Sequence, residues 1–122
     1  MQPLAIVFYE RLMPGGQLVN RLQDLHYRVL AVNNVATLAA TVQSERPLLL
    51  FIDLASRGDV CDIIKKIKTD SATTHLPVIA FAPDDQPNLL AAAQKAGAGL
   101  AVSETAVVSH LPQLLEQALH ID

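Results

Sequence analysis

The sequence predicts one α/β domain, built as a five-stranded parallel sheet with helices on both faces. Short apolar runs alternate five times with segments whose apolar residues recur at helical spacing, and this alternation is typical of a parallel sheet. Two of the runs, residues 48–52 and 78–82, are apolar without a break, as strands are when helices cover both faces of a sheet. The chain has 122 residues, and because domains commonly have about 100–150 residues, we expect a single domain over residues 1–122.

The first two strand–helix units precede residue 47. The first strand is predicted at residues 4–8, and the second at residues 28–32, before the turn-prone pair Asn33-Asn34. The segment Pro14-Gly15-Gly16 is expected to form a flexible loop that opens the first helix, because Pro and Gly interrupt regular structure. The apolar stripes of the two helices are Leu18, Val19, Leu22 and Leu25 for the first, and Val35, Leu38, Ala39 and Val42 for the second.

The remaining three units follow the same pattern. The third strand, residues 48–52, runs directly into Asp53, and in open α/β sheets ligands bind at this carboxyl edge. The fourth strand is predicted at residues 77–82, with a helix after it that ends near Gly97, and a short fifth strand at residues 100–102. The helical stripes are Val60, Ile63, Ile64 and Ile67, then Leu89, Leu90 and Ala93, and last Leu111, Leu114, Leu115 and Ala118.

Composition excludes several classes of function. The net charge is −3, and the one basic cluster, Lys65, Lys66 and Lys68, falls in a predicted helix, so nucleic acid is not an expected partner. No apolar run approaches the roughly 20 residues of a membrane span, and the first residues lack the basic region of a signal peptide. The single cysteine, Cys61, cannot form an internal disulfide and fits a reducing compartment. We therefore expect a cytoplasmic protein without a membrane partner.

Three segments carry a resemblance to a known family. They are LLLFIDL at residues 48–54, LPVIAFA at residues 76–82 and KAGAGLAVSE at residues 95–104. Together they resemble the receiver domains of response regulators in bacterial two-component systems, over nearly the whole chain, from about residue 4 to residue 119. The resemblance implies a flavodoxin-like (βα)5 sandwich of three layers, and it implies that Asp53 stands at the position of the phosphoaccepting aspartate.

The resemblance also implies where a receiver would hold Mg²⁺. In the family an acidic pair after the first strand does so, and that pair falls at Phe8 and Tyr9, with Glu10 beside them. A phenyl ring cannot ligate a cation, and a neutral phenol is a poor ligand for Mg²⁺, which prefers carboxylate oxygens. Glu10 and Asp53 are the two acids left to hold a metal. We therefore expect neither a metal nor another cofactor, with Mg²⁺ required only if the receiver site works.

Two further positions of the family's site are also changed. The hydroxyl residue that bonds a phosphoryl oxygen falls at Ala82, and the lysine falls at Glu104, or at Ser103 if the register shifts by one residue. At ~4 Å and an effective dielectric constant of about 20, replacing a cation by an anion turns roughly 4 kcal/mol of attraction into a similar repulsion. Such a change disfavours a phosphorylated Asp53.

The sequence therefore favours a degenerate receiver, or pseudo-receiver, that is not an enzyme. It would act in a two-component system or phosphorelay through contacts with a histidine kinase, an output domain or another regulator. One alternative is a conventional receiver that a histidine kinase phosphorylates on Asp53. A second alternative is a flavodoxin-like binder of a small ligand, although the segment YERLMPGG, residues 9–16, lacks the hydroxyl residues of a flavin mononucleotide loop.

Two local questions remain open from the residues alone. Asp53 either accepts phosphate or only ends its strand by bonding nearby backbone N–H groups, with Arg11 or Arg57 as a possible ion-pair partner. The aromatic rings of Phe8 and Tyr9 either plug the vacated pocket or line a cavity for a small apolar ligand.

A candidate interaction face lies on the fourth helix and the fifth strand. The segment LLAAA, residues 89–93, needs only part of its length for the core, so Ala91 and Ala92 should leave a smooth exposed surface. In receivers the fourth helix, fifth strand and fifth helix form the usual output and dimer face, which implies a homodimer or a docked partner here. The residues assigned to this face are Leu90, Ala91, Ala92, Leu100 and Val102.

Overall fold

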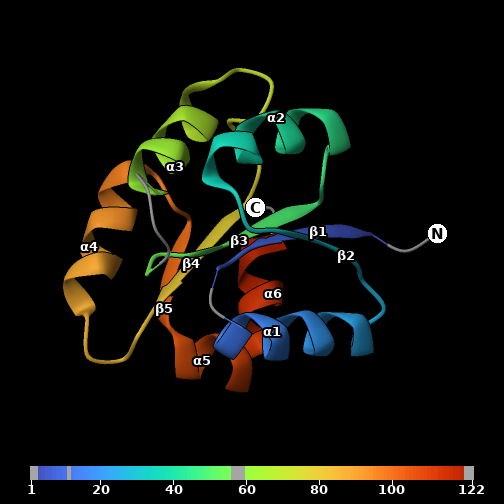
Figure 1. Ribbon diagram of the computed structural model, residues 1–122, viewed down its shortest axis with the longest axis vertical. Coiled ribbons are helices and arrows are strands. Elements are labelled where there is room, and N and C mark those ends of the chain that lie inside the picture. The colour runs from blue at the N-terminus through green and yellow to red at the C-terminus, as the bar shows by residue number, and fades with distance from the viewer. Residues whose placement is uncertain (1–2, 11, 56–59, 120–122) are drawn as a thin grey trace.

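One parallel sheet of five strands, in the order β2-β1-β3-β4-β5, forms the centre of the molecule (Figure 1). The computed structural model describes residues 3–10, 12–55 and 60–119, with residues 12–14 described by their backbone only. The strands are β1 (Leu4–Phe8), β2 (Arg28–Val32), β3 (Leu49–Asp53), β4 (Val78–Ala82) and β5 (Leu100–Ser103). The helices of these residues are α1 (Leu12–Asp24), α2 (Val35–Glu45), α3 (Val60–Thr69), α4 (Pro87–Ala96), α5 (Glu104–Ser109) and α6 (Leu111–Leu119).

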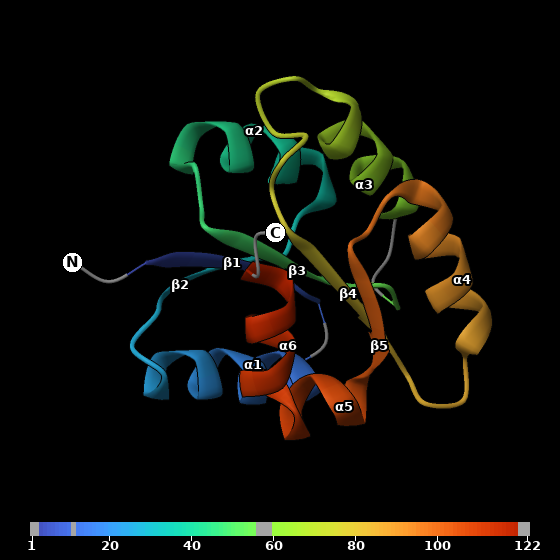
Figure 2. The ribbon, with the colours of Figure 1, turned by 180° about the vertical axis from the view of Figure 1, so that it is seen from behind.

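The helices cover both faces of the sheet, so the predicted three-layer α/β fold is confirmed. α2, α3 and α4 lie on one face, and α1, α5 and α6 lie on the other (Figures 1 and 2). Successive residues of a strand point to opposite faces, so Ile6 and Phe8 pack with α2 to α4, whereas Ala5 and Val7 pack with α1, α5 and α6. None of the helices in the described part of the chain is long and apolar enough to cross a membrane.

The two central strands, β3 and β4, are buried along their whole length. All five residues of each strand are buried, which explains why their sequences are unbroken apolar runs apart from Asp53 at the end of β3. The boundaries of β3 differ by one residue from the prediction, because Leu48 precedes the strand and is 43% exposed, whereas Asp53 is its last residue.

The ends of two helices follow local rules that the sequence contains. Asn34 caps α2, and its side-chain oxygen accepts a hydrogen bond of 2.9 Å from the N–H of Ala36. Gly97 ends α4 at φ 115°, a left-handed conformation that glycine adopts without the steric penalty of a Cβ atom. The predicted end of the fourth helix near Gly97 is therefore confirmed.

Two predictions about the first helix are wrong. The segment Pro14-Gly15-Gly16 lies inside α1 rather than in a loop, which is possible because a proline in the first turn of a helix gives up no intrahelical hydrogen bond. Leu25, which the first stripe included, lies beyond the end of α1 and is 39% exposed.

The expected last helix is confirmed as α6, with Pro112 in its first turn, but the short helix α5 before it was not predicted. The two helices are separated at His110 because Pro112 has no N–H to continue α5.

Candidate functional site

The carboxyl ends of the parallel strands bring the predicted site positions to one edge of the sheet. Phe8 ends β1 beside Ile52, the residue before Asp53. Ala82 ends β4 and is paired with Ser103, the last residue of β5. The positions that sequence reasoning selected from four separate segments therefore lie along neighbouring strands, as that reasoning predicted.

Asp53 is fully buried at this edge, with 0% of its surface exposed. Its Oδ1 atom accepts a hydrogen bond of 3.0 Å from the backbone N–H of Ala55, two residues on. This contact is typical of an aspartate that forms a local turn, and it agrees with the interpretation of Asp53 as a strand-end residue. The proposed ion-pair partners Arg11 and Arg57 lie outside the described residues.

Phe8 and Tyr9 point to opposite layers of the fold. Phe8 is 0% exposed and belongs to the apolar core beneath α2, α3 and α4. Tyr9 is half-buried and packs with the core of the other face, where its ring lies against Gly15 of α1. A Cβ atom at Gly15 would overlap this ring and would lie 2.7 Å from its Cε2 atom. A fully buried phenyl ring offers no surface to a ligand, so Phe8 fills the core rather than lining a cavity.

Within the described residues, this edge does not group the carboxylates that Mg²⁺ prefers. The two positions where the resemblance expects acids carry a core phenyl ring and a phenol packed on α1. Glu10 is exposed, whereas Asp53 is buried. Within residues 3–10, 12–55 and 60–119, no three His, Cys, Asp or Glu side chains are grouped so that they could hold a metal ion.

Asp84, in the segment after β4, is hydrogen-bonded to the start of α5. Its Oδ2 accepts the hydroxyl of Thr105 at 2.6 Å, and its Oδ1 accepts the backbone N–H of Thr105 at 3.3 Å. The hydrogen bond from the Thr105 hydroxyl is the largest of the effects that hold the pKa of the Asp84 carboxyl below its usual range. The backbone bond from Thr105 and a smaller bond from Ser103 also lower this pKa, and desolvation opposes them. Hydrogen bonds to a carboxylate favour its ionised form, so this contact is strongest when Asp84 is charged.

The sequence predicted that the lysine position of receivers is occupied by Glu104 or by Ser103, and both residues lie at the junction of β5 and α5. Ser103 is the N-cap of α5, and its side-chain oxygen accepts a hydrogen bond of 3.2 Å from the N–H of Ala106. Glu104 is the first residue of that helix, and its Oε2 atom is shielded from water. The position paired with Ala82 therefore carries Ser103, and an acid rather than a base follows it.

The contact between Asp84 and Thr105 was not predicted from the sequence. A signal was present, because Asp84 directly follows Pro83 after β4, and the segment Ser103-Glu104-Thr105 resembles the start of a helix. Neither signal shows that the two segments meet, since that follows from the pairing of β4 with β5.

The candidate interaction face divides between two environments. Ala91 and Ala92 on α4 are exposed, as predicted, while Leu90 is half-buried against the core beneath that helix. Leu100 and Val102 of β5 are also half-buried, but they pack with the core of the opposite face. The smooth exposed surface on α4 therefore consists of Ala91 and Ala92.

No protein-family model and no curated protein sequence matches this chain. Solved structures do match it: a putative response regulator from Chloroflexus aurantiacus has a TM-score of 0.89 and 16% identity, with coverage of 98% of this chain and 98% of that one. The chemotaxis response regulator CheY4 of Vibrio cholerae has a TM-score of 0.84 and 15% identity, with coverage of 98% and 100%.

The structure of NtrX from Brucella abortus matches with a TM-score of 0.82 and 20% identity. The match covers 98% of this chain but 27% of NtrX, and the receiver domain of NtrX, solved separately, matches over 99% of its length. At these identities the similarities show the fold alone. The chain has the fold of response regulator receiver domains.

Proposed function

We propose that this chain is a receiver-like signalling module that acts through protein–protein contacts and does not depend on phosphorylation of Asp53. The observation that carries this proposal is the complete burial of the Phe8 side chain in the core at the edge where Asp53 lies. A receiver of this fold holds Mg²⁺ at that position, and the cation allows the anionic phosphoryl donor to approach the aspartate. A buried phenyl ring cannot take that role, and replacing it with a ligand would remove part of the core.

The changes at the other strand ends support the same proposal. Ala82 is buried and offers a phosphoryl oxygen no hydroxyl group. Ser103 bonds the first turn of α5 as its N-cap, and Glu104 next to it is an anion. A phosphorylated Asp53 would therefore lack the lysine that the family places at the end of the fifth strand, and the side-chain hydroxyl of the fourth strand.

The Asp84 contact supports a role without a phosphorylation switch. It joins the segment between β4 and α4 to the first turn of α5, through two hydrogen bonds to Thr105. These elements border the face that receivers use for output. A surface that these hydrogen bonds hold in one conformation can bind a partner without phosphorylation.

The partner that we propose is another protein of a two-component system: a histidine kinase, an output domain, another regulator or a second copy of this chain. The exposed pair Ala91 and Ala92 on α4 would form the centre of that contact. Small side chains lose little conformational entropy when they are covered, and they allow two helices to approach closely. The proposed module has no catalytic turnover of its own.

A phosphorylation assay tests the proposal. Isotope-labelled chain is mixed with Mg²⁺ and either acetyl phosphate or beryllofluoride, and amide spectra are recorded beside an Asp53→Asn control. We expect the wild-type and control spectra to stay alike. Shifts around Asp53 and α5 in the wild type alone would overturn the proposal.

That second outcome would favour the conventional receiver. One observation supports this alternative: Asp53 is the last residue of the central strand β3, at the carboxyl edge of the sheet. It is the position that the family uses for its phosphoacceptor.

A further inference from the structure

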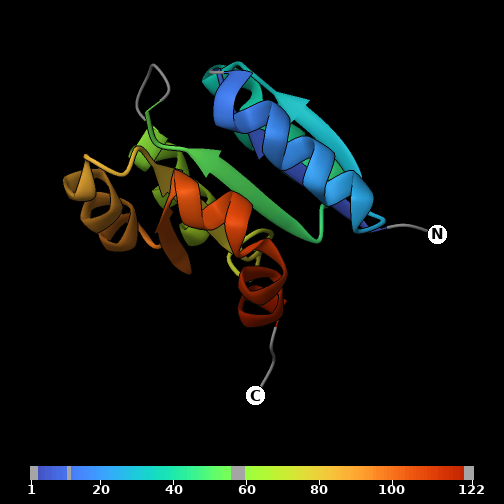
Figure 3. The ribbon, with the colours of Figure 1, turned by 90° about the horizontal axis from the view of Figure 1, so that it is seen from below.

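Among the described strands, β2 forms one edge of the sheet and pairs with β1 alone (Figure 3). The N–H of Arg28 donates to the carbonyl of Pro3 at 2.8 Å, and the carbonyl of Val32 accepts the N–H of Tyr9 at 3.0 Å. In a parallel pair, alternate residues of a strand bond to the same neighbour. The backbone groups at both ends of β2 therefore point toward β1.

The same alternation fixes the direction of the remaining groups of this strand. Leu30, like the two end residues, points its N–H and C=O toward β1. Val29 and Ala31 point theirs toward the open edge, where the described residues form no further strand. Two residues with outward N–H and C=O groups provide the hydrogen-bonding pattern that a short extended segment completes.

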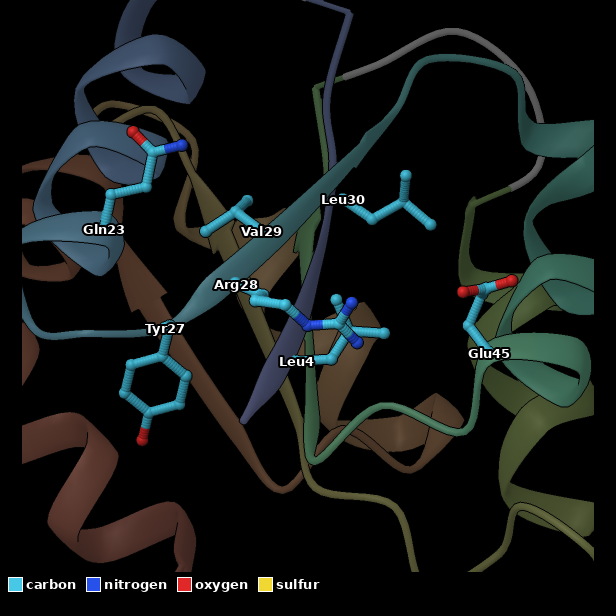
Figure 4. Close-up of a pocket in the computed structure, with 7 residues that line it drawn as sticks. All are labelled: Leu4, Gln23, Tyr27, Arg28, Val29, Leu30 and Glu45. Atoms are coloured by element: carbon cyan, nitrogen blue, oxygen red, sulfur yellow. The ribbon is translucent and has the colours of Figure 1, made fainter. Parts of the chain in front are cut away.

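A hollow of about 450 Å³ surrounds the amino-terminal half of this edge (Figure 4). Figure 4 shows Gln23 and Tyr27 on the α1 side of β2, and Leu30 and Glu45 on the α2 side. The open edge is thus bordered by the ends of two helices, one on each face. The residues that line the hollow are Leu4, Gln23, Tyr27, Arg28, Val29, Leu30 and Glu45.

The lining also indicates the chemistry of an occupant. Arg28 and Glu45 carry opposite charges, and the other lining residues are neutral, so the hollow has no excess charge to attract an anion or a cation. Val29 faces the α1 side and Leu30 faces the α2 side. An added strand would alternate in the same way, so an apolar side chain could be buried on either face.

We propose that the open edge of β2 binds an extended, uncharged segment of a partner protein, which adds a sixth strand to the sheet. The β2 strand of a second copy would bring its charged Arg28 to this edge, whereas the lining has no excess charge and favours an uncharged segment. This inference goes beyond the proposed function, because it concerns the edge opposite β5 and is independent of the state of Asp53.

One substitution separates edge binding from stability. Ala31→Pro removes an N–H that points outward, so the bonds between β2 and β1 remain, and proline is tolerated in edge strands at such a position. Ala31 is exposed, so the ring has space. The matched control is Ala31→Val, which keeps the outward N–H at the same exposed position. Thermal unfolding of both variants checks that each is folded.

The probe is a phage-displayed library of short random peptides, selected on the immobilised chain and counter-selected on Ala31→Pro. The most enriched peptide is then titrated into isotope-labelled chain. We expect amide shifts at Val29 and Ala31, an affinity for Ala31→Pro that is weaker by up to about tenfold, and unchanged affinity for Ala31→Val. Failure to enrich any peptide over the counter-selection, or shifts away from β2, would overturn the proposal. Light scattering that finds a dimer lost in Ala31→Pro would also overturn it, because the occupant would then be a second copy.

Discussion

The carboxylate of Asp84 accepts both the hydroxyl and the backbone N–H of Thr105, at 2.6 and 3.3 Å. The two residues are 21 positions apart in the chain, yet they fasten the segment after β4 to the helix that follows β5. Because the hydroxyl bond is the main reason for the lowered pKa of Asp84, the strength of this contact can be measured through that pKa.

We expect Thr105→Val to raise the pKa of Asp84 toward its ordinary value of 3.8. A lowered pKa in the folded state contributes stability that is present above the unfolded value and is lost as the pH falls through the folded value. The wild type should therefore lose more unfolding free energy than Thr105→Val when the pH falls below 3.8. Carboxyl titration by NMR and urea unfolding across that range measure both effects.

Thr105→Ser is the matched control, because it keeps the hydroxyl group and should keep the low pKa. If Thr105→Val leaves the titration of Asp84 unchanged, the hydroxyl bond does not hold this segment, and one support of the proposed function is lost.

Much of the fold could be predicted because strand burial and helix spacing leave marks in the sequence. The unbroken runs of β3 and β4 and the helix end at Gly97 are such marks. The helix α5 was missed, because its six residues are too few to show an apolar stripe at helical spacing. Long-range contacts were harder to predict, since the pairing of Asp84 with Thr105 depends on strand order.

The candidate site shows the same limit. Sequence reasoning placed Phe8, Asp53 and Ala82 correctly at one edge, because parallel strands end together. It could not predict which of Phe8 and Tyr9 would pack beneath α2 to α4 and which would pack against α1. Consecutive side chains of a strand point to opposite faces, but a shift of one residue would exchange the two assignments.

The packing of Tyr9 on Gly15 predicts that Gly15→Ala has opposite effects on the unfolding free energy with and without the Tyr9 ring. Gly15→Ala should lower the unfolding free energy by about 1–3 kcal/mol, because the added Cβ atom overlaps the Tyr9 ring and must displace it. In a Tyr9→Ala background the same substitution should instead raise it by about 0.5–1 kcal/mol, since alanine is a better helix former than glycine. Urea unfolding of the four proteins measures this cycle. Equal effects in both backgrounds would show that the ring does not rest on Gly15.

Two neighbouring threonines offer a matched comparison of buried and exposed hydrogen bonds. The hydroxyl of Thr73, which is 7% exposed, donates to the carbonyl of Ile67 at 2.6 Å. The hydroxyl of Thr74, which is exposed, donates to the carbonyl of Lys68 at 2.7 Å.

We expect Thr73→Val to lower the unfolding free energy by about 1 kcal/mol, because a buried hydrogen bond is removed without a large change of shape. Thr74→Val should change it by less than about 0.5 kcal/mol, because water can replace the lost donor. Denaturant unfolding of both variants tests the pair. A larger loss for Thr74→Val would contradict the assignment of Thr73 as the anchor of the segment between α3 and β4.

The burial of Phe8 leads to the prediction most closely tied to the proposed function. Phe8→Ala should lower the unfolding free energy by about 3–5 kcal/mol, because it leaves a cavity in the core beneath α2 to α4. Phe8→Leu keeps most of the apolar volume and should cost less than about 1.5 kcal/mol. Chemical unfolding of both variants gives these values. If Phe8→Ala were as stable as Phe8→Leu, the ring would not be a core residue. The position where a receiver holds its metal ligand would then be free to accept an acid, and the main argument against phosphorylation of Asp53 would fail.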